Sequence, residues 1–481
     1  MMPISASLPA SLFVVLIPLA AAVSAYLLRR WRSLESLAAL IGCGLVIALL
    51  SQPATTTIPV PGLPIEVGGR LDLLGRTLTV QESDRLPLVV VLASALVVLG
   101  LSWRLPQGRL FAPLGLVILS LVCAGIMIRP FVFAALAFEA AAAMAAVLIQ
   151  AERMGPLSTV GAQRYLVLSS LALPAFLGAG YVIGQALNVT EPALQSAAYQ
   201  PAALLLALGF ALLAGAVPLY TWTHAVANQA SPLVTAFLAT VVTGAVTFLF
   251  LEFKQQFDWF RGSPDVREAI NLFGVTTLLL GGVIAWAQRS WGRILACCLS
   301  VDLGVVLLML NHETPASVEA VAFAIAARGL SLGVFGAGLS ALRSYTGTDD
   351  FARLRGAGRR YPLAALAIAL GAFSIAGLPG TVGFVVRWLN VRVLSETDLE
   401  VMMIMLLAGV SIGWGVLRGL FSLLAEPLEE EGNAARAPSF LSRGASASLL
   451  LGSVVVVMLG LAPGLLAGLA RAIASAYTFY R

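Results

Sequence analysis

About fourteen long apolar runs constrain this chain more than any other feature of its sequence. Each run is bounded by charge, glycine or proline and, at 17 residues or more, is long enough for a helix that crosses a bilayer. They lie at residues 8–28, 34–50, 86–103, 110–127, 130–150, 164–186, 200–222, 232–251, 268–287, 293–310, 316–342, 362–394, 399–423 and 446–476. Because 59% of the 481 residues are hydrophobic and only 11% are charged, a soluble globular domain is excluded. The sequence therefore predicts an all-α polytopic membrane protein with about 14 transmembrane helices.

The longest polar interruption covers residues 51–85. Its stretches TTTIPVPGLPIEV and GRLDLLGRTLTVQ alternate polar and apolar residues and are punctuated by glycine and proline, which predicts a small external hairpin. A second polar connection, 424–445, carries an acidic run. We interpret this run as a solvated loop face; its members are Glu426, Glu429, Glu430 and Glu431.

Two of the apolar runs are interrupted in the same way. LLAGAVPLYTW contains Pro218, and SIAGLPGTVGFVV contains Pro379 between two glycines. Proline and glycine free backbone carbonyls, which are tolerated at membrane depth only beside protein or a wet cavity. The breaks lie five helices apart, and this odd separation predicts two inverted five-helix repeats, each with a broken helix. Two unrelated proline kinks are the alternative.

This pattern divides the chain into four parts. We expect N-terminal helices 1–3 with the external hairpin, a first repeat of helices 4–8, a second repeat of helices 9–13, and a cytoplasmic loop followed by helix 14. The corresponding residues are 1–105, 106–252, 253–424 and 425–481. The loops after odd-numbered helices hold about 17 arginines and lysines against about 10 on the other side. By the positive-inside rule both termini face outward, in a membrane that we expect to be the bacterial cytoplasmic membrane.

Cofactor motifs are absent from the sequence. The four cysteines, Cys43, Cys123, Cys297 and Cys298, all fall inside apolar runs and form no metal-binding spacing. They are expected to behave as small hydrophobic residues. Phosphate-binding fingerprints of the P-loop or dinucleotide type are also missing. We therefore expect no metal and no cofactor bound by this chain.

Four charged side chains lie deep inside the apolar runs: Glu139, Asp302, Arg328 and Arg387. Such charges cost at least about 2.5–3.5 kcal/mol each on insertion scales and often mark ion pathways. Glu139, among alanines and phenylalanines, is expected to exchange protons or to be a permanently neutral structural carboxyl. Asp302 is either a proton-carrying group or a satisfied packing residue. Arginine keeps its proton, so Arg328 and Arg387 can act only as fixed charges.

Two further basic positions need an interpretation. His224, at the inner end of the run that contains Pro218, is the one side chain with an ordinary pKa near neutral in a plausible entry position; a loop histidine facing water is the alternative. Lys254 is the only lysine among 29 basic residues. We expect it in the external loop after residues 232–251, away from any pathway.

Several stretches together resemble the antiporter-like membrane subunits of respiratory complex I, subunit N above all. GFALLAGAVPLYTWTHAVANQASPLVTAFLATVVTGAVTFLF is similar to the seventh and eighth helices of that family, and FVFAALAFE to its fifth helix with a buried glutamate. RYLVLSSLA resembles the sixth helix, RILACCLSVDLGVVLL the tenth and SIAGLPGTVGFVVRW the broken twelfth. The superfamily also includes cation/proton antiporters, membrane-bound hydrogenases and inorganic-carbon pumps.

The resemblance implies a half-channel in each repeat, joined by a polar axis at mid-membrane. Glu139 matches the buried glutamate of the family, whereas Asp302 stands where histidine is common. The three lysine positions of the family hold Leu213, Thr243 and Arg387. Leucine cannot pair with the buried glutamate or release a proton. The resemblance therefore implies a proton pathway of Glu139, Asp302 and Thr243 with water, with Arg328 and Arg387 as fixed charges.

These observations favour a membrane-arm subunit of a complex I type NADH:quinone oxidoreductase that contributes to proton translocation. The expected partners are other membrane-arm and quinone-module subunits and the lipid bilayer, with no nucleic acid; NADH and quinone would be used by partner subunits. Two alternatives stay open: a non-conducting structural subunit of such a complex, and a subunit of a cation/proton antiporter, a membrane hydrogenase or a carbon pump.

Overall fold

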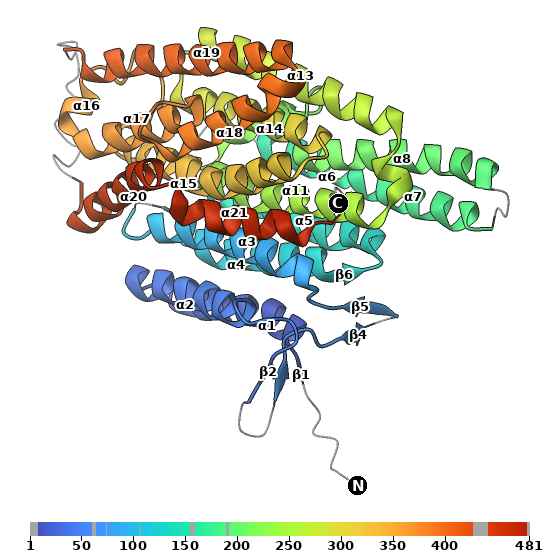
Figure 1. Ribbon diagram of the computed structural model, residues 1–481. Coiled ribbons are helices and arrows are strands. Elements are labelled where there is room, and N and C mark those ends of the chain that lie inside the picture. The colour runs from blue at the N-terminus through green and yellow to red at the C-terminus, as the bar shows by residue number, and fades with distance from the viewer. Residues whose placement is uncertain are drawn as a thin grey trace.

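Most helices of the computed structural model run roughly parallel or antiparallel to one another (Figure 1). The structure describes residues 8–59, 64–73, 75–105, 107–153, 159–188, 192–426 and 441–478. Within them, 12 helical segments are long and apolar enough to cross a membrane. Three shorter apolar helices, α4, α17 and α21, add to these. This architecture confirms the predicted polytopic helical membrane protein, whereas the count of fourteen spans and the repeats stay predictions.

Most helices of the first half lie within a few residues of the predicted ranges, except that α8 begins and ends eight residues before the run predicted over 200–222. They are α1 (Ala10–Leu27), α2 (Arg32–Leu50), α3 (Glu82–Leu101), α4 (Phe111–Met127), the 3-10 turn η1 (Phe131–Phe133), α5 (Ala134–Ala151), α6 (Val160–Ser170), α7 (Ala172–Ala186), α8 (Pro192–Ala214), α9 (Thr221–Gln229), α10 (Pro232–Phe237), the π-helix η2 (Leu238–Val242) and α11 (Thr243–Gln256). Proline at the first turn starts α10, because the missing N–H would have no intrahelical partner there.

The helices of the second half are α12 (Asp258–Arg261), α13 (Pro264–Ala287), α14 (Trp291–Asn311), α15 (Pro315–Thr346), α16 (Ala357–Arg360), α17 (Pro362–Ala376), α18 (Val382–Thr397), α19 (Leu399–Leu424), α20 (Arg443–Leu461) and α21 (Gly464–Ala476). The single helix predicted over 446–476 is wrong in one respect. The chain leaves the helix at Ala462 and Pro463 and restarts as α21, because proline cannot donate the hydrogen bond that continuation needs. Of the predicted acidic run, residues 429–431 lie outside the described residues.

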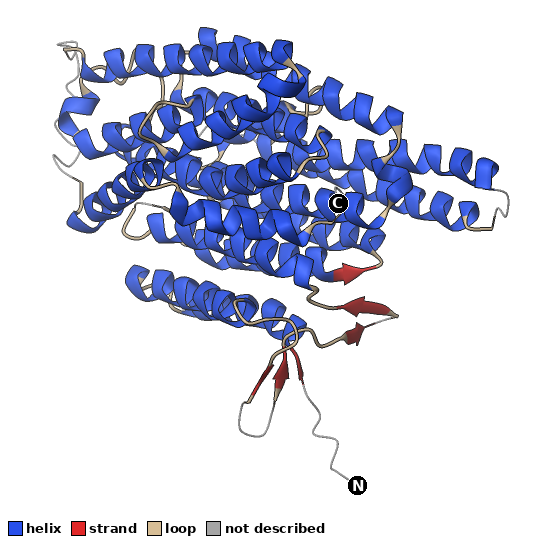
Figure 2. Cartoon of the chain, in the orientation of Figure 1, coloured by secondary structure: helices blue, strands red, loops and turns tan. Residues whose placement is uncertain are grey.

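Six short strands gather at one end of the bundle (Figure 2). β1 (Leu8–Pro9) pairs in parallel with β3 (Ile65–Glu66), which pairs antiparallel with β2 (Thr57–Ile58). β5 (Arg76–Leu78) lies between β4 (Leu71–Leu73) and β6 (Ile128–Arg129), both antiparallel to it. The predicted hairpin region is thus two three-stranded sheets that recruit partners from outside residues 51–85. We call this the strand end, and the opposite end, with α16 and the arginines of the α15–α17 connection, the arginine-rich end.

Three segments form the core of the bundle. The run α10–η2–α11 is completely buried within the protein, and α14 and α15 are almost completely buried. α15 packs against α17, α14, α10, α3 and α18, while α14 also contacts α9 and α13. The outer helices α1, α2, α13, α19 and α20 bury less than half of their most apolar stretch. Residues on α14 and α15 are therefore shielded on all sides by other helices.

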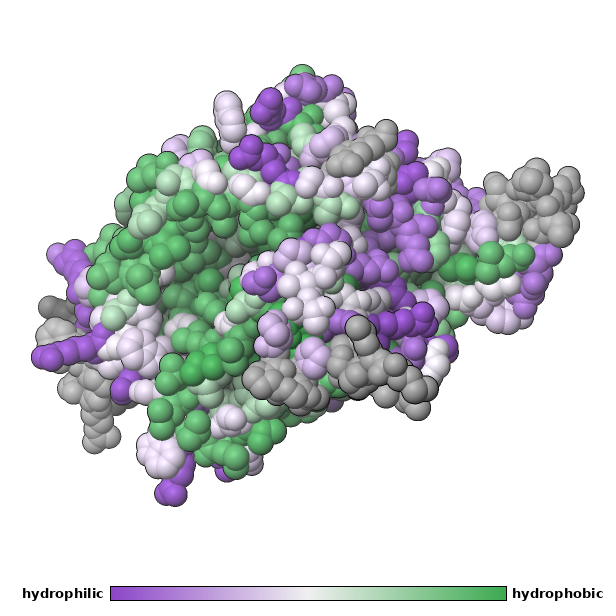
Figure 3. All heavy atoms as spheres, turned by 60° about the horizontal axis from the view of Figure 1, so that its bottom comes forward, coloured by the Kyte–Doolittle hydropathy of each residue, from purple (hydrophilic) through white to green (hydrophobic). Residues whose placement is uncertain are grey.

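The outer surface is apolar, as a bilayer or a partner subunit requires. Exposed large side chains include Phe421, Leu461, Val410 and Trp388, each more than 60% exposed. Broad hydrophobic areas dominate much of the face shown in Figure 3, with hydrophilic residues gathered in separate zones. A chain that exposes patches of this size is built to contact lipid or other proteins.

Candidate functional site

The second break opens the helix at the centre of the bundle. α17 ends at Ala376, and α18 begins at Val382. Gly377 and Gly380 adopt positive φ angles of 94° and 86°, which glycine tolerates without strain. The Oγ of Ser374 accepts a hydrogen bond from the N–H of Gly383 at 3.0 Å and so satisfies one donor freed by the break. The predicted interruption at Pro379 is therefore present and locally stabilised.

The side chain of Arg387 hydrogen-bonds to the backbone carbonyl that this break leaves without a partner in the helix. Its Nε and Nη2 donate to the carbonyl oxygen of Ile375 at 3.2 and 3.0 Å. A side chain at position 377 would collide with Arg387, because its Cβ would lie 2.7 Å from the arginine Cγ. Gly377 thus supplies both the turn and the room for the guanidinium. The carbonyl freed by the break thus stabilises the buried positive charge that the sequence predicts.

Asp302 and Arg328 form a buried ion pair between α14 and α15. The Nε of Arg328 donates to the Oδ2 of Asp302, and the arginine side chain is fully buried. Both terminal nitrogens of Arg328 are buried and have no hydrogen-bond partner among the described residues. Arg328, predicted as a fixed charge, is thus the counter-ion of Asp302 in this structure. Its unsatisfied N–H groups remain available to water or to another acceptor.

The two arginines and the aspartate line one small cavity. Asp302, Arg328 and Arg387 face it together with Ser331 and Ser374, whose hydroxyls are hydrogen-bonded at 2.8 Å. Its volume accessible to the centre of a water molecule is about 10 Å³, near the minimum that holds one water. One carboxylate and two guanidinium groups give the site a net positive charge. It can therefore stabilise a water molecule or an anion beside Asp302.

Glu139 lies apart from this cavity, on α5. The hydroxyl of Ser170 on α6 donates to its Oε1 at 2.6 Å, and the buried Oε2 has no partner among the described residues. Arg164, which could have supplied a counter-charge from the same helix as Ser170, is exposed, and no ion pair within the described residues joins it to Glu139. Leu213 at the family's lysine position is buried. The first half therefore presents a carboxyl with a hydroxyl partner and no cation.

Thr243 sits where the π-helix η2 passes into α11. Its Oγ1 bonds weakly to the carbonyl of Leu238 at 3.5 Å, five residues back. Thr247 in turn donates to the carbonyl of Thr243 at 2.8 Å. Both hydroxyls thus serve their own helix, and no described contact joins Thr243 to Asp302. The sequence reasoning missed the π-helix, a feature frequent at functional sites, because no residue pattern distinguishes it from an α-helix.

His224 lies just beyond the first break, on α9. α8 ends at Ala214, Gly215 takes a φ of 74°, and residues 215–220, with Pro218, separate α8 from α9. The Nε2 of His224 is 3.8 Å from the Sγ of Cys297 on α14. His224 is half-buried rather than facing water, and burial, with Arg293 acting in the same direction, lowers its pKa. It thus joins the broken helix of the first half to a core helix of the second.

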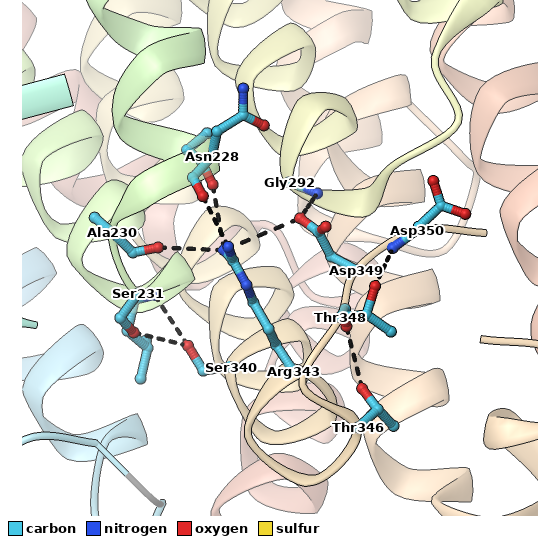
Figure 4. A network of polar contacts seen from close by, with 12 residues as sticks. Asn228, Ala230, Ser231, Gly292, Ser340, Arg343, Thr346, Thr348, Asp349 and Asp350 are labelled. Carbon is cyan, nitrogen blue, oxygen red and sulfur yellow. Dashed lines mark hydrogen bonds and ion pairs between the residues drawn. The ribbon is translucent and has the colours of Figure 1, made fainter. Parts of the chain in front are cut away.

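The sequence analysis did not single out Arg343, which directly follows the apolar run over 316–342. It lies on the last turns of α15 and points to the carboxyl end of α9, as Figure 4 shows. Nη2 donates to the carbonyl of Asn228 at 2.7 Å and Nη1 to that of Ala230 at 3.4 Å. Asp349 lies 4.0 Å from Nη1 and also accepts from the N–H of Gly292 at 3.2 Å. A cation at a helix C-terminus is favourable, so Arg343 stabilises the carboxyl end of α9, the helix that follows the first break.

Lys254 corrects a prediction. α11 continues to Gln256, so Lys254 is in its last turn and is buried rather than in an external loop. Its Nζ donates to the carbonyl of Leu310 at 2.9 Å and pairs with Glu313 at 3.2 Å. This contact ties α11 to the connection between α14 and α15. The loop was predicted because the charged residues after position 251 resemble a helix end, whereas here they are satisfied by partners distant in the sequence.

Broken helices in the core of a polytopic bundle, with buried ion pairs beside them, define a class of ion-translocating membrane proteins. The family model described as NADH:quinone oxidoreductase/Mrp antiporter, transmembrane region, matches residues 130–413. The chain belongs to this family.

Curated relatives are similar over part of the chain. NADH-quinone oxidoreductase subunit N 2 of Acidobacterium capsulatum is 28% identical over 306 residues, which cover 60% of this chain and 60% of that protein. Subunit N of Alkalilimnicola ehrlichii is 30% identical over 259 residues, or 50% and 52% of the two chains. The chain thus spans less than two thirds of the length of these two relatives.

Solved structures agree with the fold over almost the whole chain. A chain of the Mrp complex from Dietzia sp. DQ12-45-1b has a TM-score of 0.79 at 18% identity and covers 99% of this chain and 98% of that one. A chain of respiratory complex I from Thermus thermophilus has a TM-score of 0.75 at 21% identity, with 97% and 100% covered. At these identities the likeness is one of fold.

Proposed function

We propose that this chain is a membrane-arm subunit of a complex I type NADH:quinone oxidoreductase and contributes to proton translocation. The family membership and the curated subunit N relatives support this assignment. Its partners are then other membrane-arm and quinone-module subunits, which use NADH and quinone, while this chain binds no cofactor. Residues 106–252 and 253–424 act as two inverted repeats around the breaks at Pro218 and Pro379.

The observation that carries the proposal is the buried Asp302–Arg328 pair in a cavity that Arg387 also lines. A buried ion pair is expensive to maintain and is weak evidence for stability alone. Here it lies on two of the three core segments, α14 and α15, beside a helix break and a water-sized space. Charge kept at such a position in a membrane protein marks an ion pathway.

The geometry indicates how the site handles a proton. Arg328 and Arg387 are permanently charged, so only Asp302 can gain or lose a proton there. The carboxyl of Asp302 is paired with Arg328 and faces the same cavity as Arg387. Movement of this carboxyl away from Arg328 would leave both positive charges in the cavity. Glu139, hydrogen-bonded to Ser170, is the corresponding carboxyl of the first half, and Thr243 and His224 complete the pathway that we propose.

Proton movement per electron in the reconstituted whole complex tests this function. Asp302→Asn keeps the shape of the side chain and removes the titrating carboxyl, so pumping should fall while electron transfer continues. Asp258→Asn is the matched control, since its side chain is 83% exposed at the strand end. Unchanged pumping in Asp302→Asn would refute the role of this site, and Glu139→Gln applies the same test to the first half.

The alternatives are separated by partners and by ions. Gentle purification of the native protein should bring down quinone-module and flavin subunits, whereas antiporter partners would favour a cation/proton antiporter. Sodium- or bicarbonate-dependent proton movement without quinone reduction would support that second reading or a carbon pump. A structural subunit would change assembly in Leu213→Lys and Glu139→Ala without ever changing proton flux.

We also propose that the strand end, with both termini, faces out of a bacterial cytoplasmic membrane. The excess of arginines at the opposite end supports this orientation. The native cysteines are buried, so a cysteine introduced for Glu66 at the strand end, or for Arg355 at the other end, gives a clean label site. An impermeant reagent should label the first and not the second in intact cells; the reverse would invert the assignment.

A further inference from the structure

Four polar side chains from distant segments meet at the strand end, outside the site described above. Asp84 lies in the first turn of α3, Arg129 on β6, Glu252 near the end of α11 and Tyr477 directly after α21. Asp84 and Tyr477 are fully buried, and Glu252 is 3% exposed. In Figure 1 the C-terminus lies at the same end as β6, and α21 packs against α3. We call these four residues the strand-end cluster.

Arg129 forms an ion pair with Asp84 through Nη2, while its buried Nε has no hydrogen-bond partner among the described residues. Its Nη2 donates to both carboxylate oxygens, at 2.8 and 2.7 Å, and Nη1 donates to the carbonyl of Ile126 at 2.6 Å. The guanidinium lies 3.7 Å from the centre of the Phe131 ring. Asp84 also accepts from the N–H of Gln81 at 3.0 Å. The one positive charge of the cluster is therefore committed to the first of its two carboxylates.

Glu252 is the second carboxylate and has no cation of its own. It interacts with Ser83 and Tyr477, and its buried Oε1 has no partner among the described residues. Lys254, two residues further on, pairs with Glu313 instead. Asp84 repels a negative charge at Glu252, and Arg129 attracts it less than it attracts Asp84. A buried carboxylate in this position is costly unless something neutralises it.

Tyr477 cannot provide that neutralisation. Burial and the carboxylates of Glu252 and Asp84 raise its pKa well above its usual range, so the phenol stays neutral and offers only a hydrogen bond. Its position after α21 closes the cluster with the end of the chain. The remaining way to remove the charge on Glu252 is a bound proton, because two neighbouring carboxylates with one guanidinium, already paired with Asp84, favour protonation of the other carboxylate.

We propose that the strand-end cluster is a proton-binding site in which Glu252 carries the proton. Asp84 stays ionised against Arg129, and the protonated Glu252 is hydrogen-bonded to Tyr477 and Ser83. Loss of the proton to water leaves the carboxylate on Glu252, and recapture restores the acid. The role of this site in transport rests on the proposed function. In that role, the strand-end cluster holds a proton before the proton is exchanged with the aqueous phase at this end of the bundle.

Infrared spectroscopy of the purified whole complex tests the proton directly, without pumping. Glu252→Gln should lose one protonated-carboxyl C=O band at pH 7, and the exposed Glu268→Gln at the same end should keep it. An unchanged band in Glu252→Gln would overturn the proposal. Should that variant fail to assemble, Tyr477→Phe decides: removal of the hydroxyl should shift the band, and an unshifted band refutes the cluster.

A second measurement separates this site from the proposed function. Proton movement per electron should fall in Glu252→Gln and not in Glu268→Gln. Loss of the infrared band with full pumping refutes the station and leaves the function intact. An intact band in a wild-type complex that moves no protons at all refutes the function and leaves the proton-binding site.

Discussion

The two halves of the molecule use the same backbone device with opposite electrostatics. Each half contains a helix broken at a proline with glycine beside it, after Ala214 in the first and after Ala376 in the second. At the second break Arg387 binds the freed carbonyl of Ile375. At the first break the N–H of Val217 donates to the hydroxyl of Thr277 on α13 at 2.9 Å. A broken helix in this fold therefore needs a hydrogen-bond partner, which can be charged or neutral.

The buried charges differ in the same way. The second half brings Asp302, Arg328 and Arg387 to one cavity, whereas the first half offers Glu139 a single hydroxyl. Leu213, at the position where the resemblance implies a lysine, is a buried apolar residue that offers Glu139 no positive charge. The described residues thus supply arginines to the buried carboxyl of the second half and a hydroxyl to that of the first.

The largest effect is expected from breaking the ion pair of the second half. Arg328→Met leaves Asp302 buried with its partner removed, which costs about 3–5 kcal/mol in such pairs. The double variant Asp302→Asn/Arg328→Met should recover most of this, since no uncompensated charge remains. The thermal unfolding midpoint of the purified complex measures both. Additive losses in the double variant would show that the pair is not the interaction being broken.

Next in size is the loss of the hydrogen bonds at the second break. Arg387→Leu removes two bonds to Ile375 and leaves a buried carbonyl unsatisfied, at a cost of about 1–3 kcal/mol. Arg387→Lys restores the lysine of the family and should recover part of the stability and of the pumping. An equal loss of stability and pumping in Arg387→Lys and Arg387→Leu would mean that the bidentate geometry matters and the charge does not.

The sequence predicted which charged residues are buried better than it predicted which residues they contact. The apolar runs and the proline–glycine breaks predicted the positions of nearly every helix, because a helix that crosses a membrane must consist mainly of apolar residues. Asp302, Arg328 and Arg387 were recognised because charges inside such runs are rare. The partners of these charges depend on contacts across the bundle, which the spacing of residues along the sequence does not encode. Examples are the pairing of Arg328 with Asp302, the contact of Arg343 with α9 and the proximity of Glu252 to Asp84.

A third prediction converts the first half towards the family pattern. Leu213→Lys places a cation at a buried position, and its effect depends on whether Glu139 can reach it. We expect the destabilisation to be larger, by about 1 kcal/mol, in a Glu139→Gln background, within the range of coupled neighbouring residues. Denaturation of the four variants of this cycle measures the coupling. A coupling near zero would show that the lysine site and Glu139 are separate in this chain.

The smallest effect concerns the pH response of the first break. Burial, and then Arg293, lower the pKa of His224 below its ordinary 6.5, so the unfolded chain binds the proton more readily than the folded protein does. Stability should then be complete above about pH 6.5 and fall as the pH decreases from there towards the folded pKa. His224→Gln should flatten the dependence of stability on pH. The second break, where Arg387 binds the free carbonyl, should contribute no pH dependence in the same pH range. Unfolding midpoints from pH 5 to 8 measure it, and an unchanged slope in His224→Gln would assign the response to another group.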